Sequence, residues 1–125
     1  MNPSAADIAV DISDELAAAD EDFALRLVRG LVEQLEAAAP AQAATMLRDR
    51  PLTGEQRWDA LICGAVAWTC RRLGIDAPAW TRTRPLRTFW FLRPEPQLMG
   101  RLIQETPHEL AVLGIWIDAA SLRGR

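Results

Sequence analysis

The chain has 125 residues, of which 50% are hydrophobic and 25% are charged, as in one globular domain rather than a disordered chain. Its net charge of −3 and pI near 5.1 argue against a uniformly basic nucleic-acid-binding protein. Two cysteines are too few for a secreted disulfide scaffold. No apolar run approaches the roughly 18 residues of a membrane span, and no signal-peptide pattern is present. We therefore expect a single cytoplasmic domain over 1–125, without membrane association.

Charge divides the chain into two parts. Residues 1–50, the acidic part, carry ten acids and four arginines, whereas residues 51–125 carry seven acids and ten arginines. All 14 basic residues are arginines, which excludes Schiff-base and phosphate-loop lysine chemistry. The opposite charges either hold the two parts together or provide two surfaces for partners of opposite sign.

The acidic part is predicted to form three helices. Apolar residues recur at spacings of four over residues 5–19, which predicts a short amphipathic helix. Asp20 is the expected N-cap of a second helix, because its short side chain can accept a hydrogen bond from the first turn. This helix should end near Ala38, before Pro40. A third short helix is expected over 41–48.

The best-marked helix begins after these segments. Thr53 and Gln56 stand at the spacing of a capping box, and Gly74 suits the residue that follows a helix. Between Asp59 and Arg71 lie eleven consecutive uncharged residues. A helix that is apolar on every side must be surrounded by the rest of the protein, so we expect it to be the centre of the core.

Residues 77–96 are predicted to be irregular. Four prolines prevent a long helix there, at positions Pro78, Pro85, Pro94 and Pro96. Residues 88–92 suit a strand, but one strand does not make a sheet. Helical spacing returns over 97–104.

Another helix start follows. Thr106, Pro107 and Glu109 are placed as a cap, a first-position proline and an acid in the first turn, and Gly114 should close the helix. Residues 115–117 are expected to be briefly extended.

Asp118 should cap a last turn that ends near Leu122. Together these elements predict the fold class: mainly α, a single compact helical domain with a central buried helix and a proline-rich irregular segment. Its acidic helical part is 1–50, and its core helix and Arg/Trp-rich part is 51–125.

Few residues suggest catalytic or metal chemistry. Cys63 and Cys70 are seven residues apart on the expected helix, about 10.5 Å along its axis. This exceeds the Cα separation of about 4.4–6.8 Å that a disulfide permits, and it prevents the two thiols from sharing one zinc. His108, the only histidine, has no partner for a metal-binding pair and is expected to be solvated. We predict no catalytic residue, no metal site and no cofactor.

The aromatic and arginine-rich segment is the unusual feature. It interleaves Trp80, Phe89, Trp90 and Phe91 with Arg82, Arg84, Arg87 and Arg93. Three interpretations stay open: the tryptophans fasten the segment to the core while the arginines stay in water, the segment binds a protein, or it binds single-stranded nucleic acid. The candidate partner-binding residues are Trp80, Arg82, Arg84, Arg87 and Trp90.

Several short motifs resemble a family of small actinobacterial proteins, and together they cover most of the chain. They are Asp22-Phe23-Ala24-Leu25-Arg26, Arg57-Trp58-Asp59-Ala60-Leu61, Gly74, Pro78-Ala79-Trp80-Thr81-Arg82, Phe89-Trp90-Phe91, Thr106-Pro107 and Gly114-Ile115-Trp116-Ile117-Asp118. In some relatives a similar C-terminal region follows a helix-turn-helix DNA-binding domain, and such genes often lie beside nucleotidyltransferase-like toxins. The resemblance implies an antitoxin or regulator and supplies no catalytic residue. The acidic first 50 residues depart from the longer relatives, because they contain no clear helix-turn-helix.

The function expected is a non-enzymatic, antitoxin-like protein-binding module that neutralises a toxin by covering its active site. The arginines would pair with metal-binding acids of the toxin, or the acidic helices would mimic a polyanion against its basic groove. The alternative is a nucleic-acid-binding transcriptional regulator, with weak binding because the net charge is negative. The sequence leaves open whether the chain forms a homodimer. It contains no recognisable constellation of catalytic residues that would indicate a small enzyme.

Overall fold

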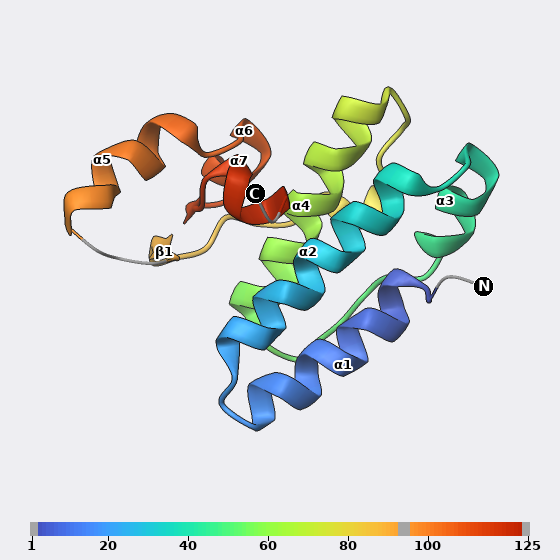
Figure 1. Cartoon of the computed structure of the whole chain (residues 1–125), viewed down its shortest axis with the longest axis horizontal. Coiled ribbons are helices and arrows are strands. Elements are labelled where there is room, and N and C mark those ends of the chain that lie inside the picture. The colour runs from blue at the N-terminus through green and yellow to red at the C-terminus, as the bar shows by residue number, and fades with distance from the viewer. Residues whose placement is uncertain (1–2, 93–95, 124–125) are drawn as a thin grey trace.

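The computed structural model describes residues 3–92 and 96–123 and is mainly helical, as the sequence predicts. In chain order the elements are α1 (Ala5–Ala17), α2 (Glu21–Ala37), α3 (Pro40–Met46), α4 (Gln56–Leu73), the 3-10 turn η1 (Ala79–Thr81), β1 (Trp90–Phe91), α5 (Pro96–Glu105), α6 (His108–Ala111), β2 (Ile115–Trp116) and α7 (Ala119–Arg123). Figure 1 shows α1 and α2 as an antiparallel hairpin beside α4, with α3 and α5 at opposite ends of the molecule.

The turn between α1 and α2 ends α1 two residues earlier than the sequence predicts. Ala19 adopts the left-handed backbone conformation, with φ 58°. Its N–H bonds to the carbonyl of Leu16 at 3.0 Å, and the N–H of Asp20 bonds to the carbonyl of Glu15 at 2.9 Å. This is the hydrogen-bond pattern of a Schellman cap, a position that usually requires glycine. The chain thus holds an alanine in a conformation that its Cβ disfavours.

Other helix ends follow the predicted chemistry. The Asp20 carboxylate accepts a hydrogen bond from the N–H of Phe23 at 3.0 Å and caps α2, as predicted. α3 begins at Pro40, slightly before its predicted start, because proline fits the first helical position. Gly74 follows α4 with φ 71°, which confirms the predicted C-terminal glycine.

The predicted capping box at the start of α4 is wrong. α4 begins at Gln56 with Glu55 as its N-cap, and no side chain caps it. The Thr53 hydroxyl instead donates to the Asp59 carboxylate at 2.7 Å and accepts from the N–H of Glu55 at 3.1 Å. The Thr53 N–H also bonds to Asp59, at 2.7 Å, so the threonine is held by an acid inside the helix.

α4 is the centre of the core, as its uncharged sequence predicts. Residues 60–66 and 68–70 are all buried, and Ala67 is half-buried. Helix α2, helix α6 and η1 all pack against α4. Among the described residues, no helix combines the length and hydropathy needed to cross a bilayer.

The two stretches predicted to be extended form a short parallel sheet. Trp90 pairs with Ile115 and Phe91 with Trp116. The N–H of Trp90 bonds to the carbonyl of Gly114 at 2.8 Å. The sequence predicts each extended stretch but not their pairing, because the strands are separated by α5 and α6.

Thr106 does not cap α6, contrary to prediction. Its hydroxyl donates to the carbonyl of Leu102 in the last turn of α5, so it completes the preceding helix instead. Pro107 is the N-cap residue of α6, which ends at Ala111, before Gly114.

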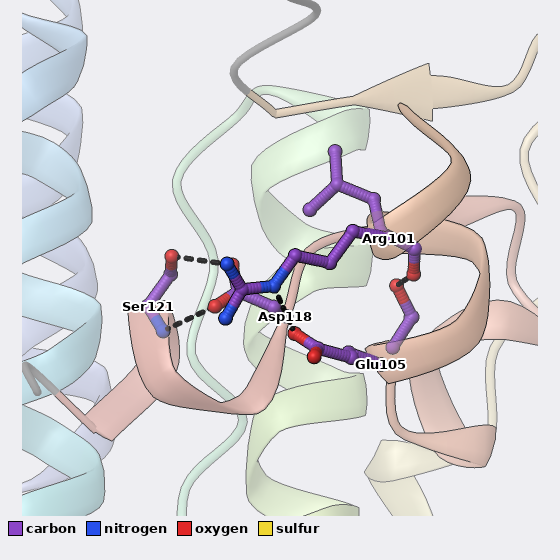
Figure 2. A network of polar contacts seen from close by, with 6 residues as sticks. Arg101, Glu105, Asp118 and Ser121 are labelled. Carbon is purple, nitrogen blue, oxygen red and sulfur yellow. Dashed lines mark hydrogen bonds and ion pairs between the residues drawn. The ribbon is translucent and has the colours of Figure 1, made fainter. Parts of the chain in front are cut away.

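Polar side chains on α5 face the start of α7. Arg101 Nε donates to Glu105 at 2.9 Å on α5. Asp118 accepts from the N–H of Ser121 at 3.3 Å and from its hydroxyl at 2.6 Å, which confirms the predicted cap. Figure 2 shows the Arg101 side chain extending toward Asp118 and Ser121.

Replacing Ala19 with glycine should stabilise the protein. The left-handed conformation costs a non-glycine residue about 1–2 kcal/mol, which exceeds the extra chain entropy of glycine. We expect the free energy of unfolding of Ala19→Gly to rise by about 0.5–1 kcal/mol in urea titrations. Ala18→Gly is the matched control and should lower it, because Ala18 has φ −85°. Equal effects of both changes would contradict strain at Ala19.

Truncating Trp68 should strongly destabilise the core. Its ring is 5% exposed, and the Arg72 guanidinium carbon lies 3.9 Å from the ring centroid. Trp68→Ala should lower the free energy of unfolding by about 3–5 kcal/mol. Phe89→Ala, at a ring that is 66% exposed, is the control and should change it by less than about 1 kcal/mol. A small effect of Trp68→Ala would show that this ring is not part of the core.

Candidate functional site

Trp80, a predicted partner-binding residue, is turned toward the protein. Its indole N–H donates to the carbonyl of Leu47, at the end of α3, at 2.8 Å. Its own carbonyl accepts a hydrogen bond from the Cys63 thiol at 3.4 Å. Trp80 is half-buried against the core and fastens η1 between α3 and α4.

Trp90 is also an inward-facing side chain. It is 8% exposed, and its ring meets that of Trp58 edge-on, with ring centroids 5.3 Å apart. The Arg57 guanidinium carbon lies 4.8 Å from the Trp90 ring centroid. The two tryptophans therefore match the first interpretation of the segment, in which they fasten it to the core.

The three predicted arginines point outward. Arg82, Arg84 and Arg87 are exposed, and none forms an ion pair with another residue in the described part of the chain. Two buried neighbours hold their backbone: the Thr81 hydroxyl donates to the Pro78 carbonyl at 2.7 Å, and the Leu86 N–H bonds to Leu113 at 2.9 Å. Three cations thus lie in contact with water on a segment that is hydrogen-bonded to its neighbours at Thr81 and Leu86.

An aromatic cluster begins two residues after Arg87, and it was not among the sites expected from the sequence. The Trp116 ring meets Phe89 edge-on at 6.0 Å and stacks on Phe91 at 5.9 Å between centroids. Phe89 is 66% exposed. A Cβ at Gly114 would lie 3.0 Å from the Phe89 ring, so glycine allows this ring to approach β2 closely.

Strand alternation was the signal that could have located this cluster. Successive side chains of a strand point to opposite faces. Trp90 and Leu92 are buried, whereas Phe89 is exposed and Phe91 is half-buried. Treating 88–92 as a strand therefore identifies the outward rings as the phenylalanines rather than the tryptophan.

Sequence and packing bring the arginines near the cluster, since Arg87 lies two residues before Phe89 and Arg82 lines a cavity beside the segment on which Phe89 packs. A shallow cavity of about 350 Å³ is lined by Arg82, His108 and Val112, among others. Val112 is 51% exposed and is followed closely by Gly114, on which Phe89 packs. We define the arginine–aromatic surface as Arg82, Arg84, Arg87, Phe89, Phe91 and Trp116.

A neutralised ion pair borders this surface. Arg71 forms a two-point hydrogen-bonded pair with Glu109. Burial alone would raise the pKa of Glu109, but the hydrogen bonds and charge of Arg71 outweigh it and lower that pKa. Glu109 is thus ionised at neutral pH and is paired with Arg71 rather than with Arg82, which lines the same cavity.

The cysteines and the histidine occupy the places expected from the sequence. Cys63 and Cys70 are free and buried on α4, and burial raises the pKa of both thiols. Protonated buried thiols are poor nucleophiles. His108 is exposed at the start of α6. Within 3–92 and 96–123, no group of three or more His, Cys, Asp or Glu side chains is placed to hold a metal ion.

No protein-family model, no curated protein and no solved structure matches the chain.

Proposed function

We propose that the chain is a non-enzymatic, antitoxin-like protein-binding module that acts in the cytoplasm and neutralises a partner protein by direct binding. One observation carries the proposal: Arg82, Arg84 and Arg87 are exposed, form no ion pair within the described residues, and precede the exposed ring of Phe89 in the aromatic cluster. Arginine and aromatic side chains are enriched in the residues that contribute most to protein–protein binding.

The roles of the predicted residues differ. Arg82, Arg84 and Arg87 would contact the partner, together with Phe89. Trp80 and Trp90 would act as positioning residues, since their indoles pack into the protein.

The partner should present acidic groups. Arginine pairs with carboxylates through two parallel hydrogen bonds, so it favours a partner with clustered carboxylates. The metal-binding acids of a nucleotidyltransferase-like toxin, the partner that the resemblance implies, have this chemistry. Binding there would neutralise the toxin by covering its active site.

Reversing the three arginines should abolish partner binding without unfolding the chain. The tagged protein is purified from its native host and the captured partner is identified by mass spectrometry. The Arg82→Glu, Arg84→Glu, Arg87→Glu variant should keep its thermal midpoint, because exposed unpaired charges contribute little to stability. It should lose the partner through like-charge repulsion. Phe89→Ala should weaken binding at least tenfold, about 1.4 kcal/mol.

Helix α2 offers matched controls. Arg26→Glu changes an exposed arginine, and Phe23→Ala removes a ring that is 42% exposed. Both should leave binding unchanged. If the triple variant still captures the partner, these arginines are not the interface. Loss of binding with the controls alone would assign the interface to the acidic helices.

The alternative function, a nucleic-acid-binding regulator, is favoured by the same aromatic cluster, since bases stack on exposed rings. We expect duplex DNA to bind only weakly, with a Kd of order 10⁻⁴ M at physiological salt, because nonspecific binding depends on counterion release and few cations are clustered here. Gel shifts with duplex and single-stranded DNA measure this. Sub-micromolar affinity at that salt concentration would favour the regulator over the protein-binding module.

A further inference from the structure

A second site lies where α2, α4 and β1 meet, and it shares Phe91 with the arginine–aromatic surface. A cavity of about 350 Å³ opens between the first turns of α2 and α4. Figure 1 shows these two helices beginning near each other, at the same side of the molecule as β1. Ligand cavities in proteins commonly have about 300–1,000 Å³, so this volume suits a small molecule.

The floor of the cavity is apolar and aromatic. Trp58 and Trp90 are 3% and 8% exposed, and their edge-on packing fixes both rings. Leu25 and Leu92, which are also buried, and the half-buried Phe91 complete the apolar wall. Such a floor favours the apolar or aromatic body of a ligand.

The mouth of the cavity carries charges of both signs. Glu21 and Asp22, in the first turn of α2, supply two exposed carboxylates, and Arg57, in the first turn of α4, supplies a guanidinium. None of the three forms an ion pair with any residue of the described ranges, including one another. Both signs of charge are thus available to a bound molecule.

The stability of the helices accounts for the positions of Glu21 and Asp22 but not for the position of Arg57. Acids favour the positive N-terminal end of a helix, whereas a cation there is disfavoured. Arg57 occupies the second position of α4 and no side chain caps that helix. Its guanidinium is held instead over the ring of Trp90, at 4.8 Å, which directs it to the edge of the cavity floor.

We propose that this cavity binds a free α-amino acid with an apolar side chain. The carboxylate of the ligand pairs with Arg57, its ammonium group pairs with Glu21 and Asp22, and its side chain contacts the apolar floor. A zwitterion satisfies both signs of charge at the mouth, whereas a simple amine or a simple acid satisfies only one. This binding activity does not depend on the proposed partner.

The test uses the purified full chain and isothermal titration calorimetry with L-phenylalanine and L-leucine. We expect at least one of them to bind saturably with a Kd below about 1 mM. For phenylalanine, 2-phenylethylamine lacks the carboxylate and 3-phenylpropanoate lacks the ammonium group. Each should bind at least tenfold more weakly than phenylalanine, or not at all. If leucine alone binds, isoamylamine and 4-methylpentanoate replace them.

Substitutions at the mouth of the cavity test which protein charge pairs with which charged group of the ligand. Arg57→Gln should weaken the amino acid at least tenfold while leaving the amine unchanged. Glu21→Gln with Asp22→Asn should weaken the amino acid similarly while leaving the simple acid unchanged. Glu33→Gln, an exposed acid farther along α2, is the matched control and should have no effect. Thermal midpoints show whether each variant is folded.

Three results would overturn the proposal. The first is the absence of saturable binding of both amino acids to the unaltered chain. The second is an amine or acid that binds as tightly as the zwitterion. The third is unchanged affinity in the folded charge variants.

Discussion

A helix with no polar side must be covered on every side, and this constraint organises the rest of the fold. The uncharged stretch of α4 is covered by α2, α6 and η1. The approach of α6 depends on Gly64, since a Cβ there would lie 2.4 Å from Leu110 Cδ2 and 3.3 Å from the Glu109 carbonyl oxygen. The position of α6 in turn places β2, which it directly precedes. The aromatic cluster therefore owes its location to the packing of a helix on which none of its members lies.

Apolar packing, rather than charge, joins the two oppositely charged parts of the chain. Across the described residues, the ion pairs between the acidic part and the remainder all use Glu36, which lies 3.3 Å from Arg72 and 3.8 Å from Arg123. The other acids of α1 and α2 are left facing solvent or the cavity mouth, and Arg82, Arg84 and Arg87 form no ion pair within 3–92 and 96–123. The uneven charge of the sequence thus leaves exposed acids on α1 and α2 and exposed arginines beside the exposed ring of Phe89.

Local chemistry in the sequence was sufficient to predict most helices, but not the features that depend on distant residues. Asp20 begins α2 and Gly74 ends α4 as predicted, because their hydrogen bonds and backbone angles are set by adjacent residues. Thr53 and Thr106 show the limit, since each bonds to a competing partner, Asp59 or the Leu102 carbonyl. The site was only partly predictable. The outward direction of the arginines followed from sequence, whereas the cluster around Trp116 depends on strand pairing across α5 and α6.

The short sheet also has a consequence for local stability. Its two strands are joined by the long excursion through α5 and α6, so their pairing carries a substantial loop-closure cost, and each strand has only two residues. Segments with so few backbone hydrogen bonds open at a lower free energy than the helical core. Opening of the sheet would separate Phe89 and Phe91 from Trp116 while α1, α2 and α4 stayed folded. A molecule bound across the rings would hold the strands closed, and amide hydrogens of β1 and β2 would then exchange more slowly than those of the same strands in the free protein.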